Sequence, residues 1–395
     1  LIYIYIYIYM DILWFKDCNY NNKHLIGGKC ASLGELFNLS SKLDFNVSDG
    51  FAITTKFYDN FIQRNNLKDF IESSLKNIDV DNLQELNKIS NELKKKILEL
   101  TFTDKELCIL KLNLTTLLCI KNDSSVAIRS SAVAEDLPNA SFAGQQDTYL
   151  NVKSFDEFVI AIKLCIASLF NARAISYRIT NNVPIDMVKI SVGVQLMVRS
   201  DIGSAGVAFS IDPETGYNKA IVINSNFGLG ESVVSGNVLP DEYIVDKRVL
   251  KENYTDPIIK KQLGKKNIIC IYTNEGTVME NSNDIQKKTH SLSDKNIILL
   301  ASNVSKIEES YQKQFNCHGI DIEWALDGID NKIYIIQARP ETVHSNTNEI
   351  VLDSFKLVSN KKLDILLKGV SVGCMISSGK VKVLKSPSEY ADFEE

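Results

Sequence analysis

The sequence predicts an α+β protein built from two lobes. Residues 55–120 repeat Leu, Ile and Phe at helical spacing between Lys, Glu and Asn, which is typical of amphipathic helices with solvated charged faces. Residues 190–245 are dominated by apolar strand patterns that glycines interrupt at turns. Two short apolar runs with a turn between them follow in DIEWALDGIDNKIYIIQARP, residues 321–340. With 395 residues, the chain is long enough for more than one hydrophobic core.

The chain begins with residues 1–9, LIYIYIYIY, in which isoleucine and tyrosine alternate. A membrane-spanning helix needs about 20 apolar residues, and a signal peptide has a basic start and a small-residue cleavage site. We therefore expect residues 1–9 to be low-complexity sequence upstream of the true start at Met10. If they are expressed, they are expected to form an aggregation-prone strand.

We assign residues 10–195 to the N-terminal lobe. It opens with a strand pattern, DILWF, followed by a loop that ends in GGK and by an amphipathic helix over residues 31–39. The other elements expected after the helical segment are the strands VAIRS (126–130) and TYLNV (148–152) and a helix over residues 155–179.

Residues 196–345 are assigned to the C-terminal lobe, in which strands come first and an amphipathic helix over residues 291–316 leads into the hairpin. Residues 346–366 are predicted to be a linker. Residues 367–395 begin another β-rich unit, which is too short for a domain. We therefore expect the chain to end within its last domain.

The composition is that of an ordinary soluble globular protein, with 45% hydrophobic residues, 24% charged residues and a net charge of −5. It indicates no basic face for nucleic acid and no membrane segment. Eight cysteines are scattered without a C-x-x-C motif, which argues against a zinc site and a disulfide framework and favours a reduced, cytoplasmic setting.

The two apolar runs of the predicted hairpin contain polar side chains. Because alternate residues of a strand share a face, Asp321 and Glu323 are expected on one face of the first strand. Ile335, Gln337 and Arg339 are expected on one face of the second. If the strands pair, oxygen ligands that suit Mg²⁺ and a guanidinium that suits phosphate converge on one surface. An edge hairpin with an ordinary Glu–Arg pair explains the same residues equally well.

A second candidate is Gly27-Gly28-Lys29, just before a predicted helix. Glycines let backbone N–H groups approach an anion, and a lysine at a helix N-terminus adds positive charge. The motif lacks the spacing of a Walker A loop. On its own, it fits a helix-capping turn better than a phosphate site.

A third candidate is the loop in VAIRSSAVAEDLPNASFAGQQDTYLNV, residues 126–152. Arg129 lies at the base of this loop, and Gly144 lies close to the next strand at Thr148. Small residues and hydroxyls can fold over a triphosphate while the arginine holds its charge. Loops of this length are often active-site lids, which favours this function over a surface loop with a structural arginine.

The fourth candidate lies in VGVQLMVRSD. Gln195 follows an apolar run, and Leu196, Met197 and Val198 supply backbone amides and carbonyls in apolar surroundings. Adenine is recognised by such a combination of apolar contact and a few fixed hydrogen bonds, although a buried β-strand is the simpler explanation of the spacing. Together, the four candidates suggest a nucleotide cleft between two α+β lobes.

The sequence resembles the phosphoenolpyruvate synthases (pyruvate, water dikinases), whose N-terminal part is a two-lobed ATP-grasp domain. The matching stretches run from about Asp11 to Glu395, and RSSAVAEDLPNASFAGQQ and IIQARPETV are highly specific to this family and its near relatives. The other matching stretches are GGKCASLGEL, SLFNARAISYR, VQLMVRSD, GVAFSIDPETG, FGLGESVVSG, PDEYIV and DIEWALDG. By the same resemblance, GVSVGCMISSGKVKVLKSPSEY matches the first strands of the family's swivelling phosphohistidine domain.

The resemblance implies roles for residues at the matching positions. Lys29, Arg129 and Arg339 would be catalytic residues that bind the phosphates of ATP. Gly144 and Thr148 would belong to the loop that covers the nucleotide.

It also implies how the base and the metal are bound. Gln195 would sit in the nucleotide pocket, with the backbone of Leu196 to Val198 near adenine. Glu323 and Gln337 would hold Mg²⁺ and the nucleotide, and Asp321 would support them.

In the family's reaction, ATP gives a pyrophosphoryl group to a histidine on the swivelling domain, and the terminal phosphate is lost to water. The phosphohistidine then converts pyruvate to phosphoenolpyruvate in a separate barrel domain, a step of pyruvate metabolism and gluconeogenesis. That histidine lies in a T-x-H or T-C-H setting, and His24, His290, His318 and His344 have no such context.

The resemblance therefore implies that this chain binds Mg-ATP but stops before the acceptor histidine. It would meet pyruvate only through a missing C-terminal domain and would not turn pyruvate over alone. The sequence leaves open whether two copies form a homodimer.

Two departures from the family pattern stand out, and both are expected to be tolerated. Cys30 replaces the Gly or Asn usual after GGK, and Ser48-Asp49 stands where a proline is usual. Alternatives that share the ATP-binding module are a rifampicin phosphotransferase and a pyruvate, phosphate dikinase. A nucleotide-binding relic without catalysis is a further alternative.

Overall fold

The computed structural model describes residues 11–341, except 77, 81, 122–123, 134–135, 138–139, 142–146, 182, 185–187, 253–255 and 275, together with residues 378, 380, 382 and 383. The predictions made for residues 1–9, for Gly144, for the linker and for most of residues 367–395 lie outside the described residues.

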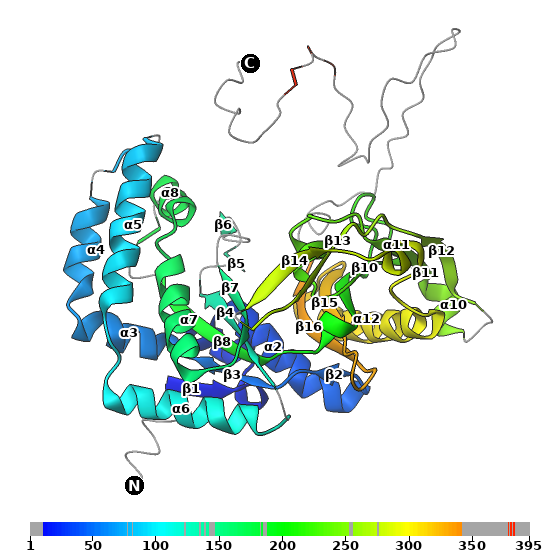
Figure 1. The fold of residues 1–395 in the computed structure, drawn as a ribbon, viewed down its shortest axis with the longest axis horizontal. Helices are drawn as coiled ribbons and strands as arrows, with labels where there is room; N and C mark the ends of the chain where they lie inside the picture. The colour runs from blue at the N-terminus through cyan, green and yellow to red at the C-terminus, as the bar shows by residue number, and fades with distance from the viewer. Residues whose placement is uncertain are drawn as a thin grey trace.

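Two sheets organise the molecule, and they lie side by side (Figure 1). The first has five antiparallel strands, in the order β1 (Ile12–Trp14), β3 (Gly50–Ile53), β8 (Ile190–Leu196), β4 (Val126–Ala132) and β7 (Thr148–Val152). The second has seven strands, in the order β12 (Ile258–Gln262), β11 (Asp241–Asp246), β10 (Ala220–Phe227), β9 (Ser204–Phe209), β15 (Ile320–Leu326), β16 (Ile333–Pro340) and β2 (Asn46–Val47). The mixture of helices and sheets confirms the α+β class.

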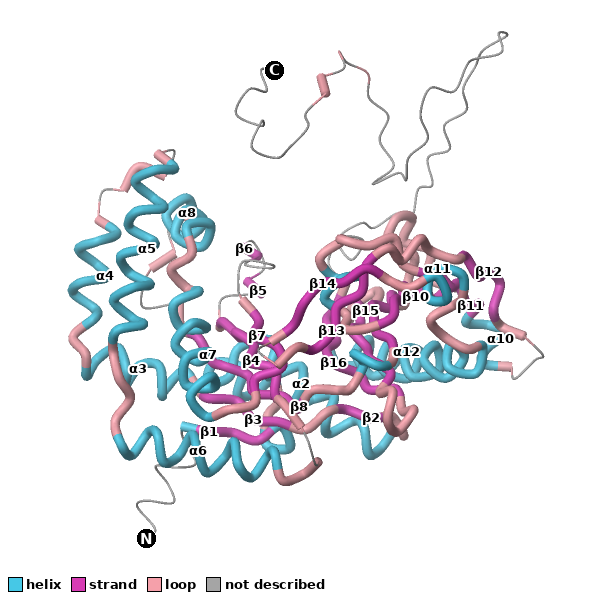
Figure 2. The backbone as a smooth tube through the Cα atoms, in the orientation of Figure 1, coloured by secondary structure: helices cyan, strands magenta, loops and turns pink. Residues whose placement is uncertain are grey.

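The helices of the first lobe gather on the side of the first sheet that is remote from the second sheet (Figure 2). They are α3 (Thr55–Arg64), α4 (Leu67–Leu75), α5 (Leu83–Glu99), α6 (Asp104–Leu118), α7 (Phe155–Ser168) and α8 (Ala172–Thr180). The second sheet packs on α12 (Asp294–Phe315), and three short helices lie around it, α9 (Glu231–Val234), α10 (Lys247–Lys251) and α11 (Asp284–Lys288). Two small hairpins, β5 (Asp136–Leu137) with β6 (Ala140–Ser141) and β13 (Ile268–Tyr272) with β14 (Thr277–Asn281), complete the strands.

Each sheet has its own hydrophobic core. In the first lobe, the apolar face of the sheet packs against helices α3 to α7, with Phe51, Phe61 and Phe158 fully buried. In the second lobe, Trp324 and Tyr311 are buried between the sheet and α12. Because large apolar side chains are removed from water on both sides of the cleft, each lobe is held together by its own burial.

Helix α2 (Lys23–Leu43) connects the lobes, since it packs on β4 and β8 of the first sheet and on β16 and β2 of the second. The predicted helix, 31–39, was too short at both ends. The chain kinks at Gly27, whose φ is 69°, and the helix ends where Asp44 takes a left-handed conformation. A Cβ atom at Gly27 would lie 2.2 Å from the Ser131 carbonyl oxygen, so glycine is required for both backbone angle and space.

The predicted single helix over 155–179 is two helices. A capping box at Ser154 starts α7, and Asn171, in an extended conformation, separates it from α8. The stretch Phe155–Thr180 has the length and hydropathy of a membrane span, but 61% of its apolar window is buried inside the protein. Packing in the first core, for example by Ile162, accounts for its apolar composition.

Candidate functional site

A cavity of about 1470 Å³ lies between the two lobes. Both sheets, helix α2 and the segment that crosses from β8 to β9 contribute to its walls. The residues predicted for the site that line it are Lys29, Arg129, Thr148, Gln195, Leu196, Met197, Val198, Asp321, Glu323, Gln337 and Arg339. Segments far apart in the sequence therefore meet at one place, as the four candidates suggested.

The guanidinium of Arg129 joins the two walls. Its Nη2 lies 3.0 Å from Glu323 Oε2 and 2.7 Å from Gln337 Oε1, and its Nη1 donates to the Ile336 carbonyl at 3.4 Å. The Arg129 side chain is only 12% exposed, so water screens this contact weakly. The Arg129 guanidinium therefore contacts both oxygens in the wall of the cavity.

The hairpin arrangement explains why these oxygens meet. Glu323 is paired with Gln337 across the two strands, and the register shifts directly after Glu323, so that Trp324 is opposite Ile335. The prediction that Ile335 shares a face with Gln337 and Arg339 was wrong, because this β-bulge turns Ile335 into the core beside Trp324. Strict alternation cannot anticipate an extra residue in one strand.

The hairpin is not a simple edge hairpin, because β15 lies between β9 and β16 and β2 follows β16. It does contain an ordinary cross-strand pair, in which Arg339 Nε lies 3.1 Å from Asp321 Oδ2 and the Arg339 side chain is 60% exposed. Burial raises the pKa of Asp321, and the Arg339 charge offsets only part of this rise. The sequence left two explanations for the polar residues of the hairpin, a ligand site and an ordinary ion pair. The ordinary ion pair holds for Asp321, whereas Glu323 bonds to Arg129 of the other lobe.

The GGK motif is both a helix start and part of the cavity wall. Ser131 donates to the Ile26 carbonyl at 2.8 Å and accepts from the Cys30 N–H at 3.1 Å, which fixes the turn onto β4. Lys29, which lines the cavity, donates to the Ser130 carbonyl at 3.3 Å. Cys30 points away into a buried site against Gly193, where burial raises the pKa of its thiol to about 11, and the departure from the family pattern is accommodated.

The crossing segment after β8 forms an apolar wall with a few free polar groups. Gln195 is 2% exposed, and its amide nitrogen Nε2 has no hydrogen-bond partner within the described part of the chain. The Met197 N–H donates to the Ser125 carbonyl at 2.8 Å. The Met197 carbonyl and the Val198 N–H are left without a partner among residues that the structure describes. The wall therefore has two donors for a ligand, the Gln195 amide and the Val198 N–H, and one acceptor, the Met197 carbonyl.

The other departure, Ser48-Asp49, supports this wall. Ser48 Oγ donates to the Leu196 carbonyl at 2.5 Å, and the Leu196 N–H donates to the Asp49 carbonyl at 2.9 Å. Both bonds fix the end of β8 immediately before the free groups.

Several wall residues were not predicted, although some lie in quoted family stretches. Glu231 belongs to the stretch FGLGESVVSG and lines the cavity. Its Oε2 accepts a hydrogen bond from the Cys270 thiol at 3.5 Å. Ser32 lies one helical turn after Lys29, donates to the Ala338 carbonyl and contacts the Tyr311 hydroxyl. Helical spacing from Lys29 was the signal that could have found Ser32. Nothing local marks Glu231, because helix α9, which begins at this residue, reaches the cavity only through the fold.

Comparison with known protein families identifies the domain that contains this cavity. The model of the pyruvate phosphate dikinase AMP/ATP-binding domain matches residues 23–357. The chain belongs to this family. The matched range covers both lobes, so the cavity lies within the AMP/ATP-binding domain.

Curated relatives carry a more specific name. Phosphoenolpyruvate synthase of Helicobacter pylori is 41% identical over 97% of this chain and 48% of its own length. The proteins of that name from Aquifex aeolicus and Escherichia coli are 41% and 38% identical over 97% of this chain, and over 46% and 48% of their own lengths. The chain thus spans about half the length of the curated relatives it matches.

Proposed function

We propose that the chain is the ATP-binding part of a phosphoenolpyruvate synthase. It binds ATP with Mg²⁺ and donates a pyrophosphoryl group to a histidine on another domain, in the reaction of ATP, pyruvate and water to AMP, phosphoenolpyruvate and phosphate. The observation that carries the proposal is the meeting of the predicted residues in one cavity between the lobes. The names of the curated relatives favour this enzyme over a rifampicin phosphotransferase or a pyruvate, phosphate dikinase.

The proposal includes the finer organisation expected from the sequence. The two lobes form an ATP-grasp domain with a boundary near residue 195, and residues 367–395 begin the swivelling domain. The enzyme works in the cytoplasm, which the free state of the cysteines that the structure describes supports.

The apolar wall is proposed to bind adenine. Adenine carries one donor, its amino group, beside an acceptor nitrogen in the same ring. The Met197 carbonyl and the Val198 N–H offer the complementary acceptor and donor, and the free Gln195 amide supplies another donor nearby. Apolar side chains on both sides keep water from competing for these bonds.

The polar wall is proposed to bind the phosphates. Lys29 and Arg129 on one side and Arg339 on the other can surround a triphosphate, with Thr148 at the base of the covering loop. Phosphoryl transfer requires little covalent chemistry from the protein, because alignment and neutralisation of charge provide most of the rate. These side chains supply both.

The same wall fits a magnesium ion. Glu323 Oε2 and Gln337 Oε1 already converge on one cation, the Arg129 guanidinium, and Asp321 lies two residues away on the same strand face. Mg²⁺ typically takes one or two carboxylates from the protein and its other ligands from phosphates and water. Among the described residues, no group of three or more His, Cys, Asp and Glu side chains is placed to hold a metal ion. When bound, the ion would neutralise phosphate charge.

Nucleotide binding tests the proposal. Calorimetric titration of the 395-residue chain with ATP and Mg²⁺ is expected to show one site, and Arg129→Met is expected to weaken it by about tenfold or more, because a charge-assisted phosphate contact is lost. Arg248→Met is the control, since Arg248 is 65% exposed, does not line the cavity and forms its ion pair with Asp246.

The whole reaction needs a second measurement. Phosphoenolpyruvate is expected from ATP and pyruvate only when parts that carry the histidine and the pyruvate site are also present. A chain that binds no ATP, or that makes phosphoenolpyruvate by itself, would contradict the proposal.

A further inference from the structure

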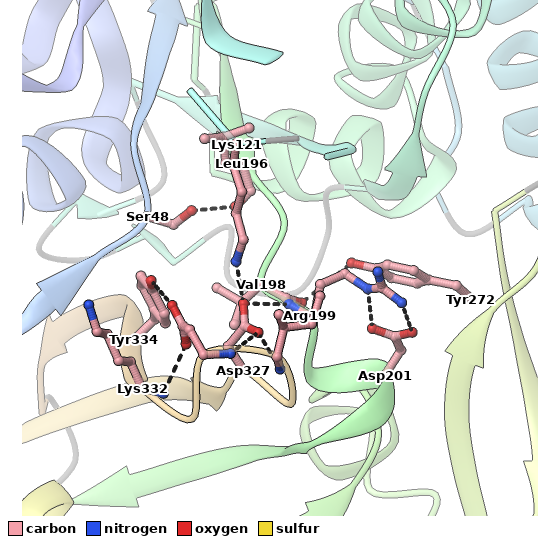
Figure 3. A network of polar contacts seen from close by, with 12 residues as sticks. Ser48, Lys121, Leu196, Val198, Arg199, Asp201, Tyr272, Asp327, Lys332 and Tyr334 are labelled. Carbon is pink, nitrogen blue, oxygen red and sulfur yellow. Dashed lines mark hydrogen bonds and ion pairs between the residues drawn. The ribbon is translucent and has the colours of Figure 1, made fainter. Parts of the chain in front are cut away.

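Asp327 lies at the junction of the two lobes, outside the cavity wall. It occupies the turn between β15 and β16, and its side chain is fully buried. Figure 3 shows Lys121 of the first lobe reaching this carboxylate, and the backbone of Arg199 beside it. We call Lys121, Arg199 and Asp327 the crossover cluster.

The two oxygens of Asp327 have different partners. Oδ1 accepts from the Ile329 N–H at 2.8 Å and the Asp330 N–H at 3.3 Å, and so closes its own turn. Oδ2 accepts from Lys121 Nζ at 2.5 Å and from the Arg199 N–H at 3.3 Å. One oxygen therefore serves the hairpin, and the other serves the first lobe and the crossing segment.

Further bonds fix the backbone around the crossing segment. The Gly328 N–H donates to the Arg199 carbonyl at 3.0 Å, so the turn is bound to both the N–H and the carbonyl of Arg199. The Tyr272 hydroxyl donates to the Val198 carbonyl at 3.4 Å. The Arg199 side chain points to Asp201, at 2.8 and 3.0 Å, and lies over the Tyr272 ring.

These contacts lie next to the two free groups of the apolar wall. Met197 and Val198 directly precede the residue that Asp327 binds. The two free groups lie between the Met197 N–H, which donates to the Ser125 carbonyl, and the Val198 carbonyl and Arg199 N–H, which are bonded to Ser200, Tyr272 and Asp327. The peptide unit that carries the Arg199 N–H shares the Cα atom of Val198 with the unit that carries the Val198 N–H, so a shift of this Cα atom would displace both N–H groups.

We propose that Asp327 is a positioning residue for nucleobase binding. Through the Arg199 N–H and Lys121, it holds the crossing segment so that the Met197 carbonyl and the Val198 N–H face the cavity. This inference rests on the proposed function. It assigns to Asp327 an effect on base binding and none on phosphate binding, because Lys29 and Arg129 lie on α2 and β4, and Arg339 lies at the end of β16 that is remote from the turn.

The experiment compares ligands that use different parts of the cavity. AMP presents the base, and inorganic tripolyphosphate presents only the phosphate chain. Both oxygens of Asp327 accept hydrogen bonds. In Asp327→Asn, an amide of nearly the same shape replaces the carboxylate, so its NH₂ group faces N–H donors and the hydrogen bonds on that side are lost. We expect AMP to bind about tenfold more weakly and tripolyphosphate to bind within about twofold of the parent chain.

Two further variants complete the test. Asp330→Asn is the matched control in the same turn, where Asp330 accepts from the Lys332 N–H and the Tyr334 hydroxyl, and it is expected to leave both affinities unchanged. Lys121→Met removes a side chain that is 34% exposed and leaves the turn intact. It is expected to weaken AMP binding by about threefold. If thermal melting shows that Asp327→Asn does not fold, the result for Lys121→Met decides the test.

The outcomes separate this inference from the proposed function. Selective loss of AMP binding supports a positioning role. Equal loss of both ligands, or no loss of either, overturns it while leaving the ATP site in place. A parent chain that binds neither ligand overturns the proposed function and this inference together.

Discussion

Arg129 was predicted as a phosphate ligand, and the structure places it against the oxygens predicted for the metal. Its Nη2 lies 2.7 Å from Gln337 Oε1 and 3.0 Å from Glu323 Oε2. The guanidinium thus occupies the position that a metal bound to both oxygens would need. If both roles hold, the arginine must turn toward the phosphates when the metal enters with the nucleotide.

Metal titration tests this exclusion. Mn²⁺ binding, followed by electron paramagnetic resonance, is expected to be weak in the parent chain alone and to strengthen when ATP is added. Arg129→Met is expected to raise the Mn²⁺ affinity without nucleotide by about tenfold, because a positive charge no longer opposes the ion.

Arg248→Met is the control, since it removes an exposed arginine that does not line the cavity and leaves Arg129 in place. Equal Mn²⁺ affinities for the parent chain and Arg129→Met would show that the guanidinium does not exclude the metal.

At the scale of elements, local patterns predicted the type of each segment more accurately than its ends. The strand patterns of residues 126–130 and 148–152 became β4 and β7, and the helix expected over 291–316 became α12. The ends of α2 were missed because Gly27 is set by contact with Ser131, which lies on another element.

Substitution of Gly27 tests this contact. Gly27→Ala is expected to lower the free energy of unfolding by about 3 kcal/mol, since it adds a clash at 2.2 Å to the cost of a left-handed angle. It is also expected to weaken ATP binding, because Lys29 lies only two residues after Gly27. Chemical denaturation measures the first effect and calorimetry the second.

Gly236→Ala provides the comparison, since Gly236 has a similar φ of 71° and nothing within 4 Å of the added carbon. Its cost is expected to be about 1 kcal/mol. Equal costs for the two variants would mean that the contact with Ser131 is not tight.

At the scale of the whole molecule, a few contacts between distant segments join the lobes. Helix α2 packs on both sheets, and the pairs Arg129–Glu323 and Lys121–Asp327 cross between them. Burial by itself would raise the pKa of Asp327, but hydrogen bonds from Lys121, Ile329 and Arg199 outweigh it and lower the pKa below its ordinary value of 3.8.

This shift makes part of the stability depend on pH. A carboxylate with a lowered pKa stabilises the folded protein fully above its unfolded value of 3.8, and this contribution is lost as the pH falls through the folded pKa. We expect the difference in melting temperature between the parent chain and Asp327→Asn to be constant near neutral pH and to shrink below about pH 4. A difference that does not change down to pH 3 would contradict the ionic role of Asp327.

Local patterns in the sequence were sufficient to predict the α+β class and to single out eleven of the residues that line the cavity, because helical and strand periodicity, turns and short motifs are local properties of the chain. The folded structure shows three features that local patterns do not: Ile335 enters the core, β2 joins the second sheet, and Arg129 bonds to Glu323 of the other lobe. It also revealed Asp327, which looked like an ordinary turn residue. Bulges, sheet partners and contacts between lobes depend on which distant segments meet, and no local pattern encodes that meeting.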